Sequence, residues 1–152
     1  MRYRIYTDGS YDAESNIGGW AFVIVDHKGI KLKSGIKKDT TNNQVELIAV
    51  LNALEYAVRK HLKDIEIITD SMYVLNGVEK YAETWKKNNW IGLSGDEIKY
   101  KSQWEGILIM LESLRENKFS VKFTKVKSHN GNSLNELADV KAREIIKAYK
   151  EK

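Results

Sequence analysis

Four acidic residues occupy polar segments at the predicted ends of strands and starts of helices. Asp8 lies in the segment TDGS, which ends the first predicted strand, and Asp70 lies in TDS, which ends a later one. Glu46 stands at the start of a predicted helix, and Asp139 lies in the first turns of the last one. Clustered carboxylates repel one another unless cations are present, and hard oxygen ligands suit Mg²⁺ or Mn²⁺. Two such ions can clamp the attacking and leaving oxygens of a phosphodiester.

The strand order decides whether these acids meet. The runs 2–7 and 64–69 are typical of strands, and a helix lies between them in the chain, so we expect them to run parallel. Asp8 and Asp70 would then lie side by side at the carboxyl edge of the sheet, where open α/β sheets place their ligands. Taken singly, each acid could equally be an ordinary turn residue or a residue that interacts favourably with a helix dipole. Their convergence on one edge favours a shared site.

The remaining elements complete the predicted sheet and its covering layers. Segments 19–25 and 30–36 form a predicted hairpin, and 120–127 alternates as a fifth strand. Residues 72–90 have a helical pattern that Gly77 and an Asn-Asn pair interrupt. A following helix has one apolar face, formed by Trp104, Ile107, Leu108, Leu111 and Leu114. The last helix has another, formed by Leu134, Leu137, Ala138, Ala142, Ile145, Ile146 and Tyr149. This order predicts one α/β domain with a mixed five-stranded sheet flanked by helices.

Composition limits the class of protein. The 152 residues suit one domain, and 42% hydrophobic with 30% charged residues is typical of a globular chain. No cysteine is present, which excludes disulfides and thiolate metal sites. The formal charge of +4 is compatible with a polyanionic partner. A strand-like start leaves no room for a signal peptide, and no apolar run approaches the ~20 residues of a membrane span. We therefore expect a cytoplasmic, monomeric protein with no membrane partner.

Five segments, in this order, resemble the bacterial-type ribonuclease HI family, which is ribonuclease H type 1. They are TDGS at 7–10, TTNNQVEL at 40–47, TDS-x-YV at 69–74, WKKNNW at 85–90 and VKSHNGNSLNELAD at 126–139. The resemblance implies a ribonuclease H-like fold over residues 1–152, with a protruding handle at about 79–101. It also implies an endonuclease that hydrolyses the RNA strand of RNA–DNA hybrids and leaves 5′-phosphate and 3′-hydroxyl ends. Asp8, Glu46, Asp70 and Asp139 would hold two Mg²⁺ ions, for which Mn²⁺ can substitute.

His129 is a further candidate for the chemistry. It lies in the polar, glycine-containing segment SHNGNS, and a histidine in such a loop can move protons near neutral pH. On the residues alone, a solvated loop histidine is the favoured interpretation. The resemblance implies a role in proton transfer and product departure beside Asp139.

The resemblance also implies a set of substrate contacts on both strands of the hybrid. Those to the RNA strand are Gly9, Ser10, Asn42 and Asn43. Those to the DNA strand are the phosphate-pocket residue Thr41 and the handle residues Tyr81, Trp85, Lys86 and Lys87. Amides read sugar hydroxyls well, while aromatic rings and lysines suit sugars and phosphates. The segment 11–18 and Met72 depart from the family pattern, so contacts from the segment are not transferred and one polar RNA contact is lost.

Two other functions remain open on the residues alone. One is a hybrid-binding module without catalysis, against which the complete set of acids and His129 argues. The other is a DNA nuclease or resolvase on the same fold, because one fold supports several chemistries. The Asn42-Asn43 pair and the aromatic, basic handle favour hybrids over DNA. Cleavage of hybrid, duplex RNA and duplex DNA with and without Mg²⁺ distinguishes the three.

Overall fold

Five strands form one mixed sheet in the computed structural model, which describes residues 2–126 and 133–152. The spatial order is β3-β2-β1-β4-β5. The strands are β1 (Tyr3–Asp12), β2 (Ile17–Asp26), β3 (Gly29–Lys38), β4 (Asp64–Thr69) and β5 (Ser120–Lys125). β1 pairs antiparallel with β2 and parallel with β4, and β4 pairs parallel with β5. The predicted fold class and the parallel arrangement of the first and fourth strands are therefore confirmed.

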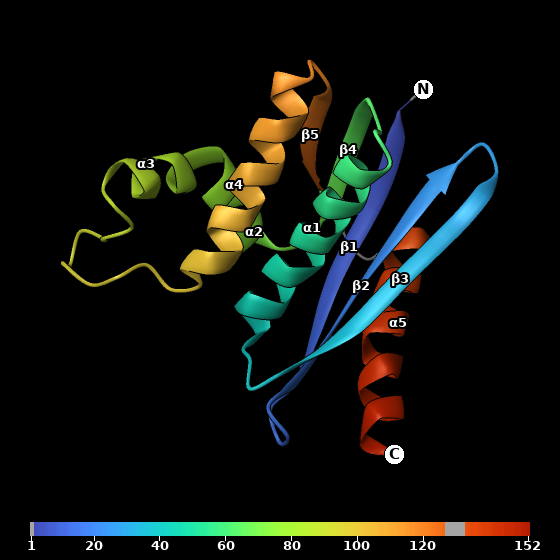
Figure 1. Cartoon of the computed structure of the whole chain (residues 1–152). Coiled ribbons are helices and arrows are strands. Elements are labelled where there is room, and N and C mark those ends of the chain that lie inside the picture. Colours follow the sequence, from blue (N-terminus) through green and yellow to red (C-terminus); the bar gives the residue numbers. More distant parts are fainter. Residues whose placement is uncertain (1, 127–132) are drawn as a thin grey trace.

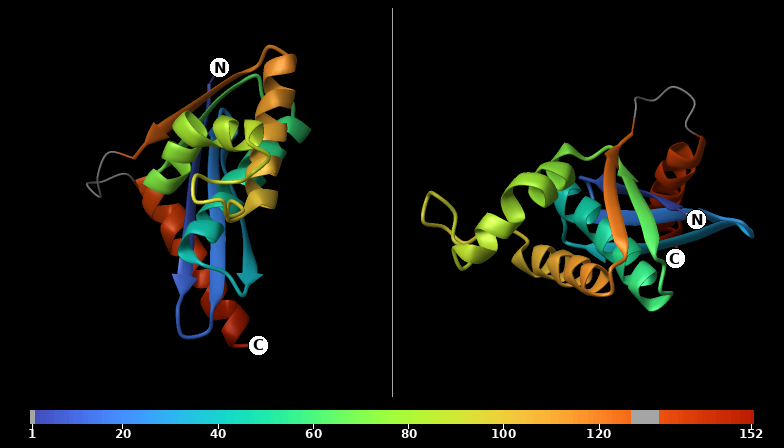
Figure 2. Two further views of the ribbon diagram at one scale, coloured as in Figure 1. Left: turned by 90° about the vertical axis from the view of Figure 1, so that its left-hand side faces the viewer. Right: turned by 90° about the horizontal axis from the view of Figure 1, so that it is seen from above.

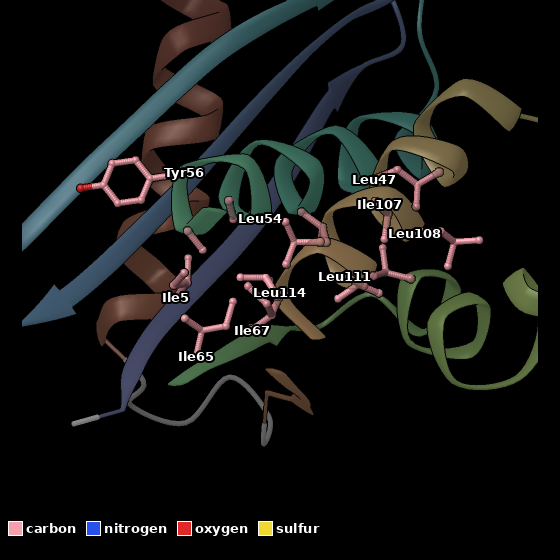
Figure 3. Packing of buried hydrophobic residues seen from close by; sticks show 14 of the residues in the cluster. Ile5, Leu47, Leu54, Tyr56, Ile65, Ile67, Ile107, Leu108, Leu111 and Leu114 are labelled. Atoms are coloured by element: carbon pink, nitrogen blue, oxygen red, sulfur yellow. The ribbon is translucent and has the colours of Figure 1, made fainter. Parts of the chain in front are cut away.

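Helices cover both faces of the sheet (Figure 1). α1 (Asn42–Arg59) and α4 (Lys101–Glu116) pack together on one face, and α5 (Ser133–Lys150) lies on the other. The main core lies between the sheet and the first pair, as the side chains in Figure 3 show. The apolar face predicted for the helix now identified as α4 is confirmed, since all five of its residues are buried. Burial of this size is the main source of stability for such a domain.

A tight hairpin joins β2 to β3. Asp26 pairs with Gly29, which leaves a two-residue turn, and the Asp26 carboxylate accepts the backbone N–H of Lys28 at 2.7 Å. Gly29 adopts a φ of +122°, a conformation that side-chain-bearing residues avoid. β3 is an outer strand of the sheet, and it carries four lysines, at positions 31, 33, 37 and 38.

The helical segment after β4 continues through Gly77. It comprises α2 (Met72–Asn76), a π-helical turn η1 (Gly77–Tyr81) and α3 (Ala82–Lys87). The predicted interruption at Gly77 takes the form of a change from α-helix to π turn, with no gap in the helical segment. The glycine also serves a close approach, because a Cβ there would lie 2.0 Å from Cη2 of Trp104. A π turn accommodates one extra residue and commonly occurs at functional sites.

The chain from η1 through the loop before α4 projects away from the sheet, as Figure 2 shows. Within this projecting segment Trp90 is buried, whereas Leu93 is fully exposed. α5 also differs from its prediction in one residue. Leu137 was expected on the buried face but is 37% exposed, because Ala138, Ala142 and Ile146 already fill the contact with the sheet.

Within residues 2–126 and 133–152, no helix combines the length and apolar character that a membrane crossing needs.

Candidate active site

β1 carries Asp8 past the end of its partner strand. The parallel pairing of β1 with β4 stops at Tyr6 and Ile68, but β1 continues alongside β2 as far as Asp12. The prediction that the TDGS segment ends the strand is therefore wrong, since pairing with β2 alone keeps it extended. Asp8 nevertheless projects beyond the carboxyl end of β4, where the predicted edge site lies, and its side chain is buried.

Three carboxylates converge at this edge. One oxygen of each of Asp8, Glu46 and Asp70 lies within 4.8 Å of the corresponding oxygens of the other two. Asp70 follows β4 directly and is exposed, whereas Glu46 is buried on the second turn of α1. Gly9 permits this approach, because a Cβ there would lie 3.0 Å from Oε1 of Glu46. The spacing is that of a site for a hard divalent cation.

The electrostatics of this cluster also favour a cation. Burial and, to a smaller degree, the charges of Asp70 and Asp139 raise the pKa of Asp8 to about 7, against a backbone hydrogen bond from Gly9 that lowers it. Burial likewise raises the pKa of Glu46 well above its usual value, with added repulsion from Asp8 and Asp70. A bound cation would reverse this penalty, because it favours the charged carboxylates. The donor set therefore fits Mg²⁺ or Mn²⁺, whose preferred ligands are oxygens.

Asp139 lies beside this cluster without joining the compact group. It is close enough for its charge to raise the pKa of Asp8. Its Oδ2 accepts a hydrogen bond from Arg143 at 3.1 Å, one helical turn further along α5. Arg143 is not among the residues expected at the site, although an arginine four residues after a helical aspartate is a recognisable ion-pair spacing. His129, the other predicted member of the catalytic set, lies outside the described residues.

The N-terminus of α1 presents the predicted substrate amides. Thr41 caps the helix by accepting the backbone N–H of Gln44 at 3.2 Å, and its hydroxyl lies 2.5 Å from that of Tyr100. Asn42 and Asn43 form the exposed first turn, one turn before the cluster residue Glu46. Tyr100, which precedes α4, was not selected from the sequence because no local pattern marks a contact 59 residues away.

The predicted handle residues divide between two hollows. Tyr81 stacks on Trp85 with ring centroids 5.8 Å apart, and Trp85 meets the buried ring of Trp104 edge-on at 5.6 Å. The pair lines a hollow of about 880 Å³ that also includes Lys87. Lys86 faces another hollow, between α3 and α4, whose lining also contains Glu83, Glu112 and Glu116. The structure thus places one of the two predicted lysines beside the aromatic pair.

Comparison with known proteins agrees with this architecture. A family model described as RNase H matches residues 1–147. A ribonuclease H of Neorickettsia sennetsu is 39% identical over 148 residues, covering 97% of this chain and 94% of that protein. A ribonuclease H of Francisella philomiragia is 41% identical over 142 residues, covering 93% of this chain and 88% of its own.

Solved structures share the fold at lower identity. LC9-RNase H1, described as a type 1 RNase H with the type 2 active-site motif, superposes with a TM-score of 0.74 at 22% identity. That match covers 94% of this chain and 71% of LC9-RNase H1. The PFV RNase H domain gives a TM-score of 0.72 at 23% identity, covering 94% of this chain and 90% of the domain. The chain therefore belongs to the RNase H family, enzymes that cleave the RNA strand of RNA–DNA hybrids.

Proposed function

We propose that this RNase H cleaves hybrids with two divalent ions, Mg²⁺ in the cell, held by Asp8, Glu46, Asp70 and Asp139. The observation that carries the proposal is the convergence of the first three carboxylates within 4.8 Å, two of them buried with raised pKa values. Ions bound there would supply Lewis-acid stabilisation of the phosphodiester and activation of water. His129 is proposed to move the proton that accompanies departure of the 3′-oxygen.

The polypeptide itself would orient the RNA strand. Asn42 and Asn43 extend from the first turn of α1, and Gly9 and Ser10 follow Asp8 on β1. Amide donors and acceptors can bind 2′-hydroxyls across the wide minor groove of a hybrid, which distinguishes an RNA strand from DNA. We therefore assign the selection of the cleaved strand to these four residues.

The DNA strand would lie towards the handle. Thr41, with its hydroxyl held by Tyr100, is proposed to bind a DNA phosphate. Tyr81 and Trp85 offer stacked aromatic faces for deoxyriboses, and Lys86 and Lys87 offer charges for phosphates. A foamy viral protease-reverse transcriptase with the same fold, TM-score 0.78 and 22% identity, was solved in complex with an RNA/DNA hybrid. This chain spans 20% of that protein, so the likeness supports hybrid binding by the shared fold alone.

A cleavage assay tests the proposal. Labelled hybrid, duplex RNA and duplex DNA are incubated with the protein in Mg²⁺, in Mn²⁺ and in chelator, and the products are sized on a gel. We expect cleavage of the RNA strand of the hybrid alone, only with a divalent ion, and its loss in Asp70→Asn. The control is Asp96→Asn, which changes an exposed acid in the projecting loop. Cleavage by Asp70→Asn at the normal rate would remove the carboxylate cluster from the mechanism, and cutting of duplex DNA would indicate a DNA nuclease.

A further inference from the structure

A second cleft opens next to the carboxylate cluster, between β1 and the C-terminal half of α5. Its volume is about 420 Å³. Its lining consists of Ser10, Tyr11, Asp12, Arg143, Ile146, Lys147, Lys150 and Glu151. The β1–β2 turn and the C-terminal end of α5 lie at the same end of the molecule in Figures 1 and 2. Lys150 closes that end with an ion pair to Asp12 at 2.9 Å.

Cations line one wall of this cleft at regular intervals. Arg143, Lys147 and Lys150 follow Asp139 on α5 at spacings of four, four and three residues, which places all of them on one stripe of the helix. Arg143 pairs with Asp139 and Lys150 with Asp12. Within residues 2–126 and 133–152, no carboxylate lies within ion-pair distance of Lys147, whose side chain is exposed.

The cleft is continuous with the proposed metal site on both of its walls. On β1, Asp8, Ser10 and Asp12 alternate along the same face of the strand. On α5, the stripe begins at Asp139 itself, and Arg143 both pairs with Asp139 and lines the cleft. A strand of nucleic acid cut at the cluster and continuing along β1 would therefore pass directly between these two walls.

We propose that this cleft binds a phosphate of the RNA strand on one side of the cut, with Lys147 as its principal contact. This inference rests on the proposed function and adds the path of the RNA strand to it. From Asp8 to Asp12 the strand rises about 13 Å, which corresponds to about four base-pair steps along the axis of a duplex at 3.4 Å each. Lys147 is about two helical turns, or about 12 Å, beyond Asp139 and therefore faces the far part of that path, towards Asp12.

The lining of the cleft combines basic and acidic side chains, and this balance suits a transient contact with a phosphate. Its two acids are Asp12, which is paired with Lys150, and Glu151 at the far end. A metal ion held by Asp139 would share the charge of that carboxylate, and Arg143 would then be available as a second cation for the phosphate. The cleft would thus bind substrate best when the metal site is loaded, which couples the two sites through one ion pair.

The test compares Lys147→Gln with Lys141→Gln, a matched lysine on the same helix that does not line the cleft. Steady-state cleavage of a long hybrid is measured over a range of salt concentrations. For Lys147→Gln we expect KM to rise about threefold to tenfold at an unchanged kcat, as for one exposed charge-assisted contact. We also expect the slope of log affinity against log salt to fall by about 0.7 to 1. Lys141→Gln should leave both values unchanged.

Substrate length then locates the contact. Two further hybrids are used, each shortened to about two base pairs from the cut, one on the 5′ side and the other on the 3′ side of the RNA. One of the two shortened hybrids should raise the KM of the wild-type protein and leave that of Lys147→Gln unchanged, so that the two proteins become equal. A difference that persists on both shortened hybrids, or is absent on the long one, overturns the inference. If the wild-type protein cuts no hybrid at all, the proposed function itself fails.

Discussion

Replacing Asp8 by asparagine should stabilise the metal-free protein. Burial, followed by the charges of Asp70 and Asp139, raises the pKa of Asp8 from 3.8 to about 7. Each pKa unit corresponds to about 1.4 kcal/mol, so ionising Asp8 costs the folded protein about 4 kcal/mol relative to the unfolded chain. The substitution removes this cost, and an asparagine oxygen can still accept the N–H of Gly9, as the carboxylate does at 3.0 Å.

The gain should depend on pH in a defined direction. Below about pH 4 the carboxyl is protonated in both the folded and the unfolded wild-type protein, so the two proteins should be almost equally stable. Between pH 4 and about pH 7 the unfolded chain loses its proton while the folded protein keeps it, and the stability of the wild type falls. Above that range the difference should level off. The raised pKa of Glu46 makes the fall in wild-type stability steeper.

Urea unfolding followed by circular dichroism, in chelator at pH 4, 5.5 and 8, measures this difference. We expect Asp8→Asn to gain up to about 4 kcal/mol at pH 8, or roughly 8 to 16 °C in Tm at about 2–4 °C per kcal/mol. Added Mg²⁺ should then stabilise the wild type more than the variant, because the ion binds the folded site.

Asp64→Asn provides the opposite control. Asp64 is exposed, and a hydrogen bond from Ser120, aided by Arg2, lowers the pKa of its carboxyl. That shift stabilises the folded protein above the unfolded pKa, so this variant should gain nothing at pH 8. An Asp8→Asn variant that is no more stable than the wild type at pH 8, or equally more stable at pH 4, would refute the reasoning.

Three other substitutions or substrate changes test separate parts of the molecule. His129→Ala should lower single-turnover cleavage by about 10²–10⁴ if it transfers a proton, with hybrid affinity measured by filter binding nearly unchanged. Gly77→Ala should lower Tm, because its Cβ would lie 2.0 Å from a ring carbon of Trp104; the cost is about 1–3 kcal/mol, and an unchanged melting curve would show that the ring can shift. Consecutive 2′-deoxy sugars at the cut should block cleavage, since each hydroxyl contact of Asn42 or Asn43 is worth about 1–3 kcal/mol; normal cutting would remove the amides from strand selection.

The sequence predicts the sheet and its layers well because periodicity reports burial directly. The apolar face of α4 and the parallel relation of β1 and β4 follow from spacing and connection length alone. The end of β1 cannot be predicted in this way, because it depends on pairing with β2 as far as Asp12. No residue in TDGS prevents an extended backbone. The predicted burial of Leu137 is wrong for a related reason. A helical stripe of apolar residues predicts which face is buried but not how wide the contact with the sheet will be.

The sequence predicts the acidic residues of the site but not the residues that contact the other parts of it. Asp8 lies just beyond the end of its pairing with β4, Asp70 follows β4, and Glu46 is near the start of α1, so the topology brings the three together. Tyr100 reaches Thr41 across 59 residues, a contact that depends on where α4 packs and that no local pattern records. The role of Gly77 is also not visible in the sequence, because only the structure shows that the ring of Trp104 occupies the space where a side chain would lie.

The outer strand β3 has a consequence for how copies of this protein behave at high concentration. Its free edge presents backbone N–H and C=O groups that can pair with the same edge of another molecule. Lys31, Lys33, Lys37 and Lys38 give that edge a row of positive charges. Two such edges brought together would place lysine against lysine, and repulsion between opposed like charges disfavours the pairing. The strand that flanks the catalytic sheet thus discourages the first step of its own aggregation.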